Sequence, residues 1–487
     1  MKIKFKIIYF ITALVIIYIF AIKLIYNKEN NFLFKIKSLI PNSVKHSLKN
    51  TIFVIPNLKN NISKLEKENE ALKLEIHQNK ILLKEIKNRY FPENISFFVK
   101  ERNKIIKSKY SNYKITIFQT NFLDNGKARP AKASAYLEEY EDKILLVNAD
   151  GIFSYFYKND IKKERFDSIT ISSNIKELVD YQEFYKKSQK GIKDILIDGK
   201  KLFVSFTNQL SDHCYNTSIM VADINFEYLK FNKFFVPNQC VKKNDNYGGI
   251  NYHIAGGRMV DFKNNQILFS TGGMKNFEHA QNKTSPLGKI LSINKSTGDW
   301  NVISMGHRNV QGMKYDFKKD LILSTEHGPT GGDEFNINFS PSSNNVKNYG
   351  WPISSYGKHY GNIKNSKEIK LKYEKAPLYK SHKKYGFIEP LKYYVPSIGI
   401  TEIEKIPKKF NKDFDNDFLI ASMGDKVEEG DLSFHHIKLD KEYKKILKED
   451  IIVIGERIRD FKYIKNLNKI ILFIENSPGI GILSLEP

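Results

Sequence analysis

Three short segments carry polar and charged residues of the kinds that bind ligands and catalyse reactions. They read MGHRNVQGM (305–313), STEHGPTGGDEFNINF (324–339) followed by KNYGWP (347–352), and GERIRDF (455–461). The guanidinium groups of Arg308, Arg457 and Arg459 offer fixed bidentate donors, which suit a ligand with several carboxylates or carbonyl oxygens. The turn at Gly328 and Pro329 exposes backbone carbonyl oxygens, which are hard ligands of the kind that Ca²⁺ prefers. Together the segments predict a polar ligand pocket.

Each segment also has a purely structural interpretation. His307 can be a hydrogen-bonded residue of the core or of a loop, and Glu326, Asp333 and Glu334 can hold loops together through ion pairs. NYGWP can be a packed turn with an aromatic plug. Residue type and spacing alone leave both interpretations open.

The part of the chain that must position these segments is rich in β-strand signals. From residue 110 onward, short β-rich runs are broken by Gly, Asn and Asp and recur about every 45 to 60 residues, with no long amphipathic helix between them. Repeated antiparallel units at this spacing predict an all-β fold, a β-propeller over residues 110–487, in which loops from different sheets meet at one central pocket. A β-sandwich is the alternative, but this length would require two or more such domains.

The chain contains two cysteines, Cys214 and Cys240, which flank two candidate strands. A disulfide between them would close this hairpin and stabilise the fold by about 3 kcal/mol if the body lies outside the cytoplasm. Two unrelated free thiols are the alternative.

The N-terminal region has a different character. Sixteen residues between Lys6 and Lys23 carry no charge. Roughly 20 residues are needed to span a bilayer, and the flanking lysines can reach the interface. Residues 1–30 are therefore predicted to form a transmembrane anchor, followed by a linker over 31–56. A cleavable signal peptide is the alternative.

Residues 57–91 are predicted to form a coiled-coil stalk. Apolar residues and two asparagines recur there at alternating steps of four and three: Leu58, Ile62, Leu65, Asn69, Leu72, Ile76, Asn79, Leu83, Ile86 and Tyr90. This heptad seam is typical of helices that associate, so the segment indicates a possible homo-oligomer. A single helix packed against the body is the alternative.

The 78 Lys+Arg and 54 Asp+Glu of the 487 residues give a formal net charge of +24. No nucleic-acid-binding module accompanies this basic excess, so we expect no nucleic-acid partner. Residues 1–92 hold 17 basic and 6 acidic residues. Nearly half of the excess, +11, therefore lies outside the predicted propeller.

The stretch from about Gln189 to Asp460 resembles the PQQ-dependent soluble glucose and aldose sugar dehydrogenases, also called the glucose/sorbosone dehydrogenase family. The resemblance runs through SQKGIKDILID, HIAGGRMVDF, LGKILSIN, GHRNVQGM, TEHGPTGGDEFNIN, NYGWP, YVPSIGIT and RIRD. It implies a six-bladed β-propeller that binds pyrroloquinoline quinone (PQQ) over its central channel. It also implies export, so that the membrane-anchored propeller would lie in the periplasm.

The resemblance further implies roles for particular residues. The residues that match the family's cofactor-binding positions are Gln189, Arg308, Asn309, Arg457 and Arg459. The carbonyls of Gly328 and Pro329 match those that hold Ca²⁺. His253 would act with Arg308 in catalysis, as the general base that takes the hydroxyl proton of a sugar or other alcohol while hydride passes to PQQ. Electrons would then go to an envelope acceptor.

The chain departs from the family at several site positions. His253 lies one residue farther from Arg258 than the family spacing, and Gly273 stands where the family has an Asp that orients the base. Glu278 is a possible replacement for that Asp. His327 stands where a glucose-oxidising member has Gln, and Lys426 is near the place of an expected lysine. These departures keep open the hypothesis of a catalytically degenerate propeller that binds ligands or serves in envelope assembly. A third hypothesis is a calcium-dependent hydrolase on a similar propeller, but the three arginines argue against it.

Overall fold

The computed structural model describes residues 16–20, 41–90, 93–120, 134–179, 191–242, 250–341, 343, 345–360 and 367–486. The chain divides into two compact units, Met1–Glu85 and Ile86–Pro487. The site residues proposed from the sequence all belong to the second unit.

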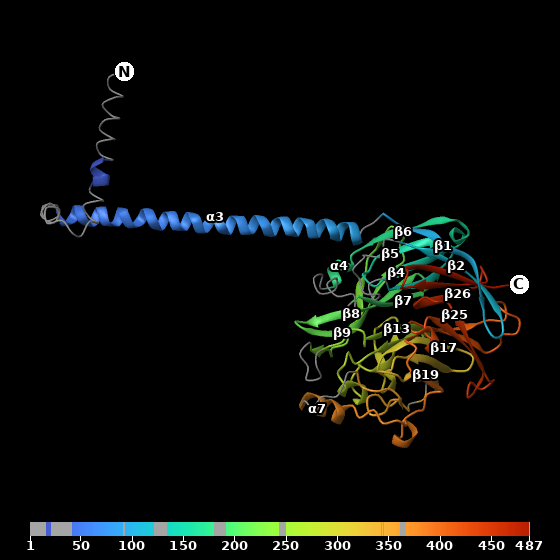
Figure 1. Cartoon of the computed structure of the whole chain (residues 1–487). Helices are drawn as coiled ribbons and strands as arrows, with labels where there is room; N and C mark the ends of the chain where they lie inside the picture. The colour runs from blue at the N-terminus through green and yellow to red at the C-terminus, as the bar shows by residue number, and fades with distance from the viewer. Residues whose placement is uncertain are drawn as a thin grey trace. The chain divides into compact units, whose positions relative to one another are not determined.

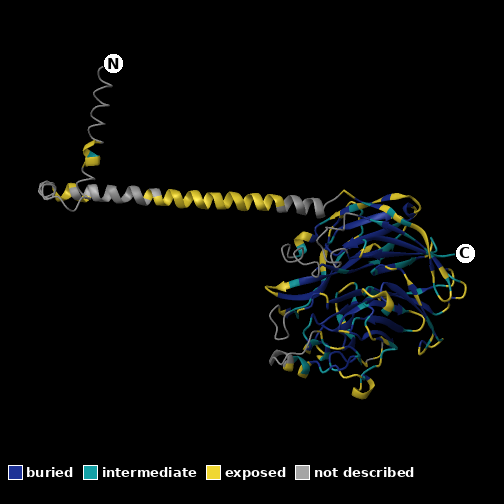
Figure 2. Cartoon of the chain, in the orientation of Figure 1, coloured by how far each residue is buried: buried dark blue, intermediate teal, exposed yellow. Residues whose placement is uncertain are grey.

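A long helix, α3 (Asn42–Tyr90, 49 residues), dominates the first unit. It begins fifteen residues before the predicted stalk, so the predicted linker over 31–56 is partly helical and Pro56 lies inside the helix. The heptad residues Leu58, Ile62, Leu65 and Ile76 are each more than half exposed, and the helix is drawn in yellow where its side chains are described (Figure 2). Association through this seam stays a prediction.

The predicted membrane anchor is contradicted. Among the residues that the structure describes, no helix combines the length and the apolar character needed to cross a bilayer. Of the predicted span over 1–30, residues 16–20 are described and the rest lies outside the described residues. Charged residues recur along α3, so it cannot supply a continuous apolar surface of the required length.

The described residues of the second unit consist mainly of antiparallel strands that form five hydrogen-bonded sheets (Figure 1). The largest sheet has the order β26-β27-β28-β2-β1-β6-β5-β4-β3, with β10 beside β6; the others have the orders β11-β9-β8-β7 with β12, β13-β14-β15-β16-β20, β17-β18-β19-β21, and β22-β23-β24-β25. The strands are β1 (Asn94–Lys107), β2 (Asn112–Gln119), β3 (Ala135–Tyr140), β4 (Lys143–Asn148), β5 (Phe153–Tyr157), β6 (Arg165–Ser173), β7 (Ile192–Asp198), β8 (Lys201–Ser211), β9 (Cys214–Asp223), β10 (Tyr228–Leu229), β11 (Asn232–Phe235), β12 (Val241–Lys242), β13 (Gly256–Phe262), β14 (Gln266–Thr271), β15 (Lys289–Asn294), β16 (Trp300–Met305), β17 (Val310–Asp316), β18 (Leu321–Glu326), β19 (Asp333–Phe339), β20 (Lys347–Asn348), β21 (Lys392–Tyr394), β22 (Ile400–Ile406), β23 (Asp417–Ser422), β24 (Ser433–Leu439), β25 (Ile446–Val453), β26 (Ile458–Ile464), β27 (Lys469–Ile474) and β28 (Gly479–Leu485). The short helices α4 (Ile175–Leu178), α6 (Glu278–Gln281) and α7 (Lys367–Lys375) lie in the connections.

The core lies between neighbouring sheets, where Figure 2 shows the strands in dark blue. The second strands of the sheets, such as β18, β23 and β27, are buried along nearly their whole length because other sheets pack on both of their faces. The first strands contact one another in the cyclic order β3, β7, β13, β17, β22, β26 and back to β3. This closed, barrel-like arrangement confirms the predicted all-β, propeller-like class.

The N-terminal strand β2 completes the sheet of the C-terminal strands. It pairs antiparallel with β28 over seven residues, from Tyr113 opposite Leu485 to Gln119 opposite Gly479. β1 then links β2 to β6. Both ends of the unit therefore lie in one hydrogen-bonded sheet.

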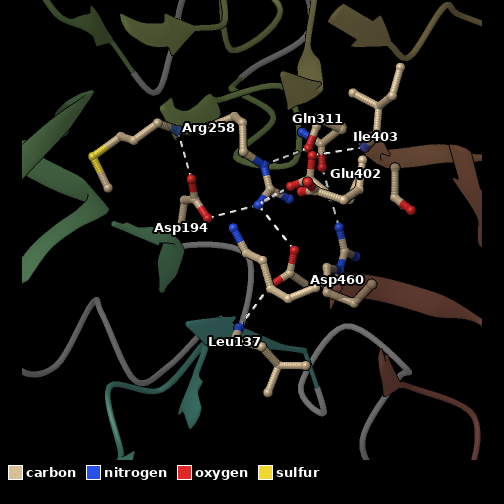
Figure 3. Close-up of polar contacts among 12 residues, drawn as sticks. Leu137, Asp194, Arg258, Gln311, Glu402, Ile403 and Asp460 are labelled. Carbon is tan, nitrogen blue, oxygen red and sulfur yellow. Dashed lines mark hydrogen bonds and ion pairs between the residues drawn. The ribbon is translucent and has the colours of Figure 1, made fainter. Parts of the chain in front are cut away.

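A buried guanidinium joins the inner strands across the centre of the unit (Figure 3). Nη1 of Arg258, on β13, lies 2.8 Å from Asp194 Oδ1 on β7, 2.5 Å from Glu402 Oε2 on β22 and 3.2 Å from Asp460 Oδ1 on β26. Its Nε donates to the carbonyl oxygen of Gln311 on β17 (2.8 Å), and Asp460 accepts from the backbone N–H of Leu137 on β3 (2.7 Å). Burial raises the pKa of Asp194 to about 7 and also raises that of Glu402. This central cluster ties all of the innermost strands together.

Candidate functional site

Arg457 and Arg459 share one buried carboxylate. The pairing of β26 with β27 places Glu475, just after β27, beside both of them. Arg459 Nε donates to Glu475 Oε1 at 2.6 Å, and Arg457 Nε donates to Oε2 at 3.3 Å. Burial favours the neutral acid, but the two arginines outweigh burial and hold the pKa of Glu475 below its usual value. Glu475 therefore fixes both guanidinium groups.

The other nitrogens of these two arginines are only partly used. Arg457 Nη1 donates to the Met423 carbonyl and to Asp425 Oδ1 (3.1 Å), whereas Arg459 Nη1 donates to Gln311 Oε1 (3.2 Å). Within the described residues, no protein acceptor contacts Nη2 of either arginine. Each guanidinium is thus held at Nε and at Nη1, and its Nη2 donors are left for an anionic ligand.

Arg308 and Asn309 are positioned by Glu326. Its Oε1 accepts the backbone N–H groups of Arg308 and of Asn309, the second at 3.2 Å. Its Oε2 lies 2.9 Å from His307 Nδ1, and His307 Nε2 lies 2.8 Å from Ser304 Oγ. His307 is fully buried, so it supports the neighbouring site residues and does not face a ligand.

The Arg308 side chain extends from this support toward an aromatic wall. Nη1 donates to the carbonyl oxygen of His327 at 2.9 Å. The guanidinium carbon lies 5.4 Å from the centroid of the Trp351 ring and 6.0 Å from that of Tyr360. The predicted NYGWP segment therefore forms part of the site and is also a packed turn.

Gln311 joins the two groups of arginines. Its Nε2 donates to Asn309 Oδ1 (3.1 Å), and its Oε1 accepts from Arg459. Asn309 Oδ1 also accepts from the backbone N–H of Gly256 (3.0 Å), within the HIAGGR segment. The structure therefore brings Arg308, Asn309, Arg457 and Arg459 into one network.

The Gly328–Pro329 turn is held by Asp333. Oδ1 accepts the Gly328 N–H, and Oδ2 accepts the Ile400 N–H, each at 3.0 Å. A Cβ at Gly328 would lie 2.2 Å from the carbonyl oxygen of Gly332, so the close approach excludes any side chain there. The two carbonyls predicted to bind a metal thus sit in a rigid turn. No group of three or more His, Cys, Asp or Glu side chains with metal-binding geometry occurs among the described residues.

His253 lies near the cationic side of the site. Its backbone N–H donates to Asn251 Oδ1 at 3.0 Å, and the described residues provide no hydrogen-bond partner for its ring. Partial burial, together with the charges of Lys193 and Arg459, lowers the pKa of His253 to about 4. The imidazole is therefore neutral at pH 7.

Among the described residues, no carboxylate stands where the family's Asp would orient His253. The loop at Gly273 forms a tight turn in which the Asn276 N–H donates to the Gly273 carbonyl at 2.7 Å. A Cβ at Gly273 would lie 2.7 Å from the Asn276 carbonyl oxygen. Glu278, the proposed replacement, pairs with Lys375 Nζ at 3.1 Å.

Four other predicted residues have different outcomes. Gln189 lies outside the described residues. Lys426 is exposed and pairs with Glu429 at 2.7 Å, so its ammonium is engaged outside the network of arginines. Cys214 and Cys240 form a disulfide that links β9 to the segment before β12.

A small polar pocket extends from Arg308 toward His382. Its lining includes Glu326, His327, Gly328, Glu334, Trp351 and His382. His382 Nε2 lies 3.1 Å from Glu334 Oε1, and this carboxylate raises the pKa of His382 against the opposing effect of burial.

Sequence reasoning missed several of the residues that build the site. One feature of the sequence could have indicated Glu475: it is an acidic residue directly after the apolar run KIILFI. A lone acid at such a position must be paired, because an unpaired buried charge is costly. Asp194 and Glu402 had the same kind of signal, whereas the role of Gln311 depends on contacts between strands that are distant in sequence.

Comparison with known proteins agrees with this architecture. The profile of the family described as Glucose / Sorbosone dehydrogenase matches residues 160–482. The crystal structure of the soluble aldose sugar dehydrogenase of Escherichia coli in the apo form covers 72% of this chain and 95% of its own length, with a TM-score of 0.54 and 18% identity. A crystal structure of a glucose dehydrogenase covers 72% and 96%, with a TM-score of 0.55 and 19% identity. At these identities, the structural likeness shows the fold alone.

Two curated relatives match a shorter part of the chain. The aldose sugar dehydrogenase YliI of Escherichia coli is 28% identical over 198 residues, which are 36% of this chain and 49% of the relative. An uncharacterised protein of Synechocystis is 28% identical over 200 residues, 38% of this chain and 42% of the relative. The chain therefore matches about half the length of these relatives or less.

The fold defines an all-β, propeller-like protein. Because the family profile covers about two thirds of its length, the chain belongs to the glucose/sorbosone dehydrogenase family.

Proposed function

We propose that this protein is a quinoprotein dehydrogenase that oxidises a sugar or another alcohol by hydride transfer to PQQ, with the assistance of Ca²⁺. The observation that carries the proposal is the network in which Glu475, Gln311 and Glu326 hold three arginines from different parts of the chain. Two of these arginines retain Nη2 donors that no described protein group uses. An electron acceptor would reoxidise the cofactor.

The donor set fits PQQ, a planar quinone with three carboxylates. Arg457 and Arg459 would bind acidic groups through their Nη2 atoms, and the matching positions of Asn309 and Gln189 would supply further polar contacts. Trp351, beside Arg308, offers a flat surface against which a planar ring can pack. The cofactor would supply the capacity to accept a hydride.

The Gly328–Pro329 turn fits Ca²⁺ less completely. Two carbonyl oxygens provide hard ligands, but Ca²⁺ takes six to eight oxygens. The remaining ligands would come from water and from the cofactor's own oxygens. Asp333 would act on this site indirectly, because it holds the backbone N–H of Gly328.

The chain's own residues would bind the substrate, move its proton and stabilise charge. Arg308 would stabilise negative charge that develops on an oxygen at the reacting centre. A neutral imidazole would accept the hydroxyl proton. The family resemblance indicates His253 for this role; its ring is neutral at pH 7, and no carboxylate of the described residues orients it.

We further propose that the propeller has six blades. The cyclic contacts of β3, β7, β13, β17, β22 and β26 support one blade for each of these inner strands. On this view, the largest sheet comprises two blades that β1 joins.

Residues 57–91 are proposed to associate two or more chains as a coiled coil. The exposed apolar seam of α3 supports this idea, because a single exposed helix gains nothing from such a stripe. Sedimentation of the full chain and of a variant without residues 57–91 tests it. A monomer in both cases would refute it.

The function is tested by reconstituting the full chain with PQQ and Ca²⁺. Binding is measured from PQQ absorbance and turnover from the reduction of a dye by a panel of aldoses and alcohols. Saturable binding with turnover supports the proposal. Binding without dye reduction would indicate a ligand-binding propeller, and no binding would refute the assignment of the arginines.

A further inference from the structure

Lys193 is the extra residue of a β-bulge in the inner strand β7. Against β8, Ile192 pairs with Phe206 and Asp194 pairs with Ser205, so one additional residue lies between two consecutive pairs. A bulge re-aims the extra side chain, and bulges are frequent beside functional sites. Lys193 is partly exposed, whereas Ile192 and Asp194 on either side of it are buried. The bulge therefore presents one cationic side chain from an otherwise buried part of β7.

Two residues of the arginine network occupy the same kind of position. Arg459 is the extra residue of a bulge in β26, and Gln311 is that of a bulge in β17. In all three strands the bulge falls on the second residue, which is partly exposed between two buried neighbours. These strands belong to the ring of first strands around the centre of the unit. Lys193 thus lies at the same end of its strand as Arg459 and Gln311.

The central cluster connects the positions of Lys193 and Arg459. Asp194 and Asp460, which follow them directly, both contact Nη1 of Arg258, at 2.8 and 3.2 Å (Figure 3). In both strands the order is an isoleucine, a cation, an aspartate and an apolar residue. The two strands therefore repeat one arrangement, in which the aspartate binds the buried guanidinium and the cation lies beside it.

The ammonium of Lys193 also lies beside the segment that carries His253. Its Nζ donates to the carbonyl oxygen of Tyr252 at 3.2 Å. A Cβ at Gly257 would lie 2.3 Å from Cβ of Lys193, so the glycine leaves room for the lysine stem. Burial, together with the charge of Arg459, lowers the pKa of Lys193 to about 7. A bound anion would offset these effects and keep the ammonium protonated.

We propose that Lys193 and Arg459 together bind one carboxylate at the centre of the site, through Nζ of the lysine and Nη2 of the arginine. The inference rests on the proposed dehydrogenase function, which offers two sources of that group: PQQ itself, or a substrate that is an acidic sugar such as a uronate. Charge-assisted bonds from an ammonium and a guanidinium suit the two oxygens of a carboxylate. Lys193 would then supply the ammonium that Lys426, paired with Glu429, does not.

Equilibrium binding to the full chain, without turnover, tests the proposal. Lys193→Met removes the charge and keeps most of the stem, whereas Lys193→Arg keeps the charge. Lys201→Met is the matched control, because Lys201 lies at the exposed start of β8 and pairs with Asp223 at 3.1 Å. The affinity for PQQ is measured from its absorbance. The affinity for glucuronate, with glucose as its neutral counterpart, is measured by calorimetry.

The two sources of the carboxylate give different results. If PQQ supplies it, we expect Lys193→Met to lower PQQ affinity about tenfold or more, and Lys193→Arg and Lys201→Met to change it less than about threefold. If the substrate supplies it, wild type binds glucuronate more tightly than glucose, and Lys193→Met lowers the affinity for glucuronate about tenfold while PQQ affinity stays unchanged. Either result supports the carboxylate site.

A purely structural role of Lys193 predicts another outcome. If Lys193→Met lowers the melting temperature and leaves both affinities unchanged, the lysine only holds the Tyr252 carbonyl, and the proposal is overturned. An equal loss of affinity in Lys201→Met would overturn it too. Circular dichroism shows whether each variant has folded. If Lys193→Met does not fold, Lys193→Gln replaces it, because the neutral amide can still donate to that carbonyl.

Failure of the proposed function can be distinguished from failure of this inference. If wild type binds no PQQ, the dehydrogenase function fails, and glucuronate binding to wild type and to Lys193→Met decides the inference. Wild type that binds neither carboxylate overturns both. If PQQ binds with an affinity that does not depend on Lys193, and glucuronate binds no better than glucose, the dehydrogenase function stands and the carboxylate site is refuted.

Discussion

Glu475 Oε1 lies 2.6 Å from Nε of Arg459, and the other oxygen of the same carboxylate contacts Nε of Arg457. Nη2 of each guanidinium has no acceptor among the described residues. One acidic side chain therefore prepares two cationic groups for one ligand.

The variant Glu475→Gln tests whether this carboxylate holds the two arginines in place. The amide removes the charge that pairs with both arginines, so their side chains gain freedom and lose their fixed orientation. We expect PQQ affinity to fall at least tenfold, measured by titration of the full chain. Glu164→Gln, on an exposed residue paired with Arg102, is the control and should leave the affinity unchanged.

Arg258→Met should strongly destabilise the propeller. The change leaves Asp194, Glu402 and Asp460 buried without their shared cation, and removal of one partner of a buried ion pair costs about 3–5 kcal/mol. Denaturant unfolding of the full chain measures the loss. Arg165→Met, at an exposed ion pair, should cost less than about 1 kcal/mol. Equal losses for the two variants would show that the central cluster contributes nothing particular.

Stability without ligand should fall as the pH drops from about 6.5 toward 4. The pKa values of His253 and His327 are lowered to about 4 in the folded protein, whereas an unfolded histidine titrates near 6.5. The unfolded state therefore binds protons across this window that the folded state does not, which favours unfolding. Melting temperatures measured from pH 7.5 to 4 should fall less steeply for His253→Gln combined with His327→Gln than for wild type. An identical slope would contradict the lowered pKa values.

Restoring the family's carboxylate at position 273 should not improve the enzyme. The Cβ of any side chain at Gly273 meets the Asn276 carbonyl oxygen at 2.7 Å, so the turn must shift. We expect Gly273→Asp and Gly273→Ala to lose similar stability, with no gain in kcat for the aspartate. A kcat that rises in Gly273→Asp but not in Gly273→Ala would favour His253 as the base.

The sequence was informative where local pattern decides structure. Alternating β-rich runs and ordered motifs predicted the propeller-like class and the segments that carry Arg308, Asn309, Arg457 and Arg459. The prediction of the class succeeds because strands and turns depend on nearby residues, whereas the roles of these four residues stay predictions. The membrane anchor was wrong, and the linker boundary differed because the helix continues through Pro56.

The residues that hold the site in place could not be predicted from local sequence patterns. Whether Glu475 faces arginines or solvent depends on the register of β26 and β27, and whether Asp333 lies near His327 depends on how a loop returns. His307 shows the same limit, since its neighbour Arg308 faces the site while His307 itself is buried against Glu326. Such assignments need three-dimensional contacts.

The pairing of β2 with β28 has a consequence for biosynthesis. During translation, residues 112–119 emerge long before residues 479–485. β2 therefore cannot pair with β28 until nearly all of the remaining chain has been synthesised. Until then, its backbone N–H and C=O groups on that side have no native strand partner and can pair with another chain. A nascent or C-terminally truncated protein should therefore be the species most prone to aggregation, and prompt release of the complete chain should protect it.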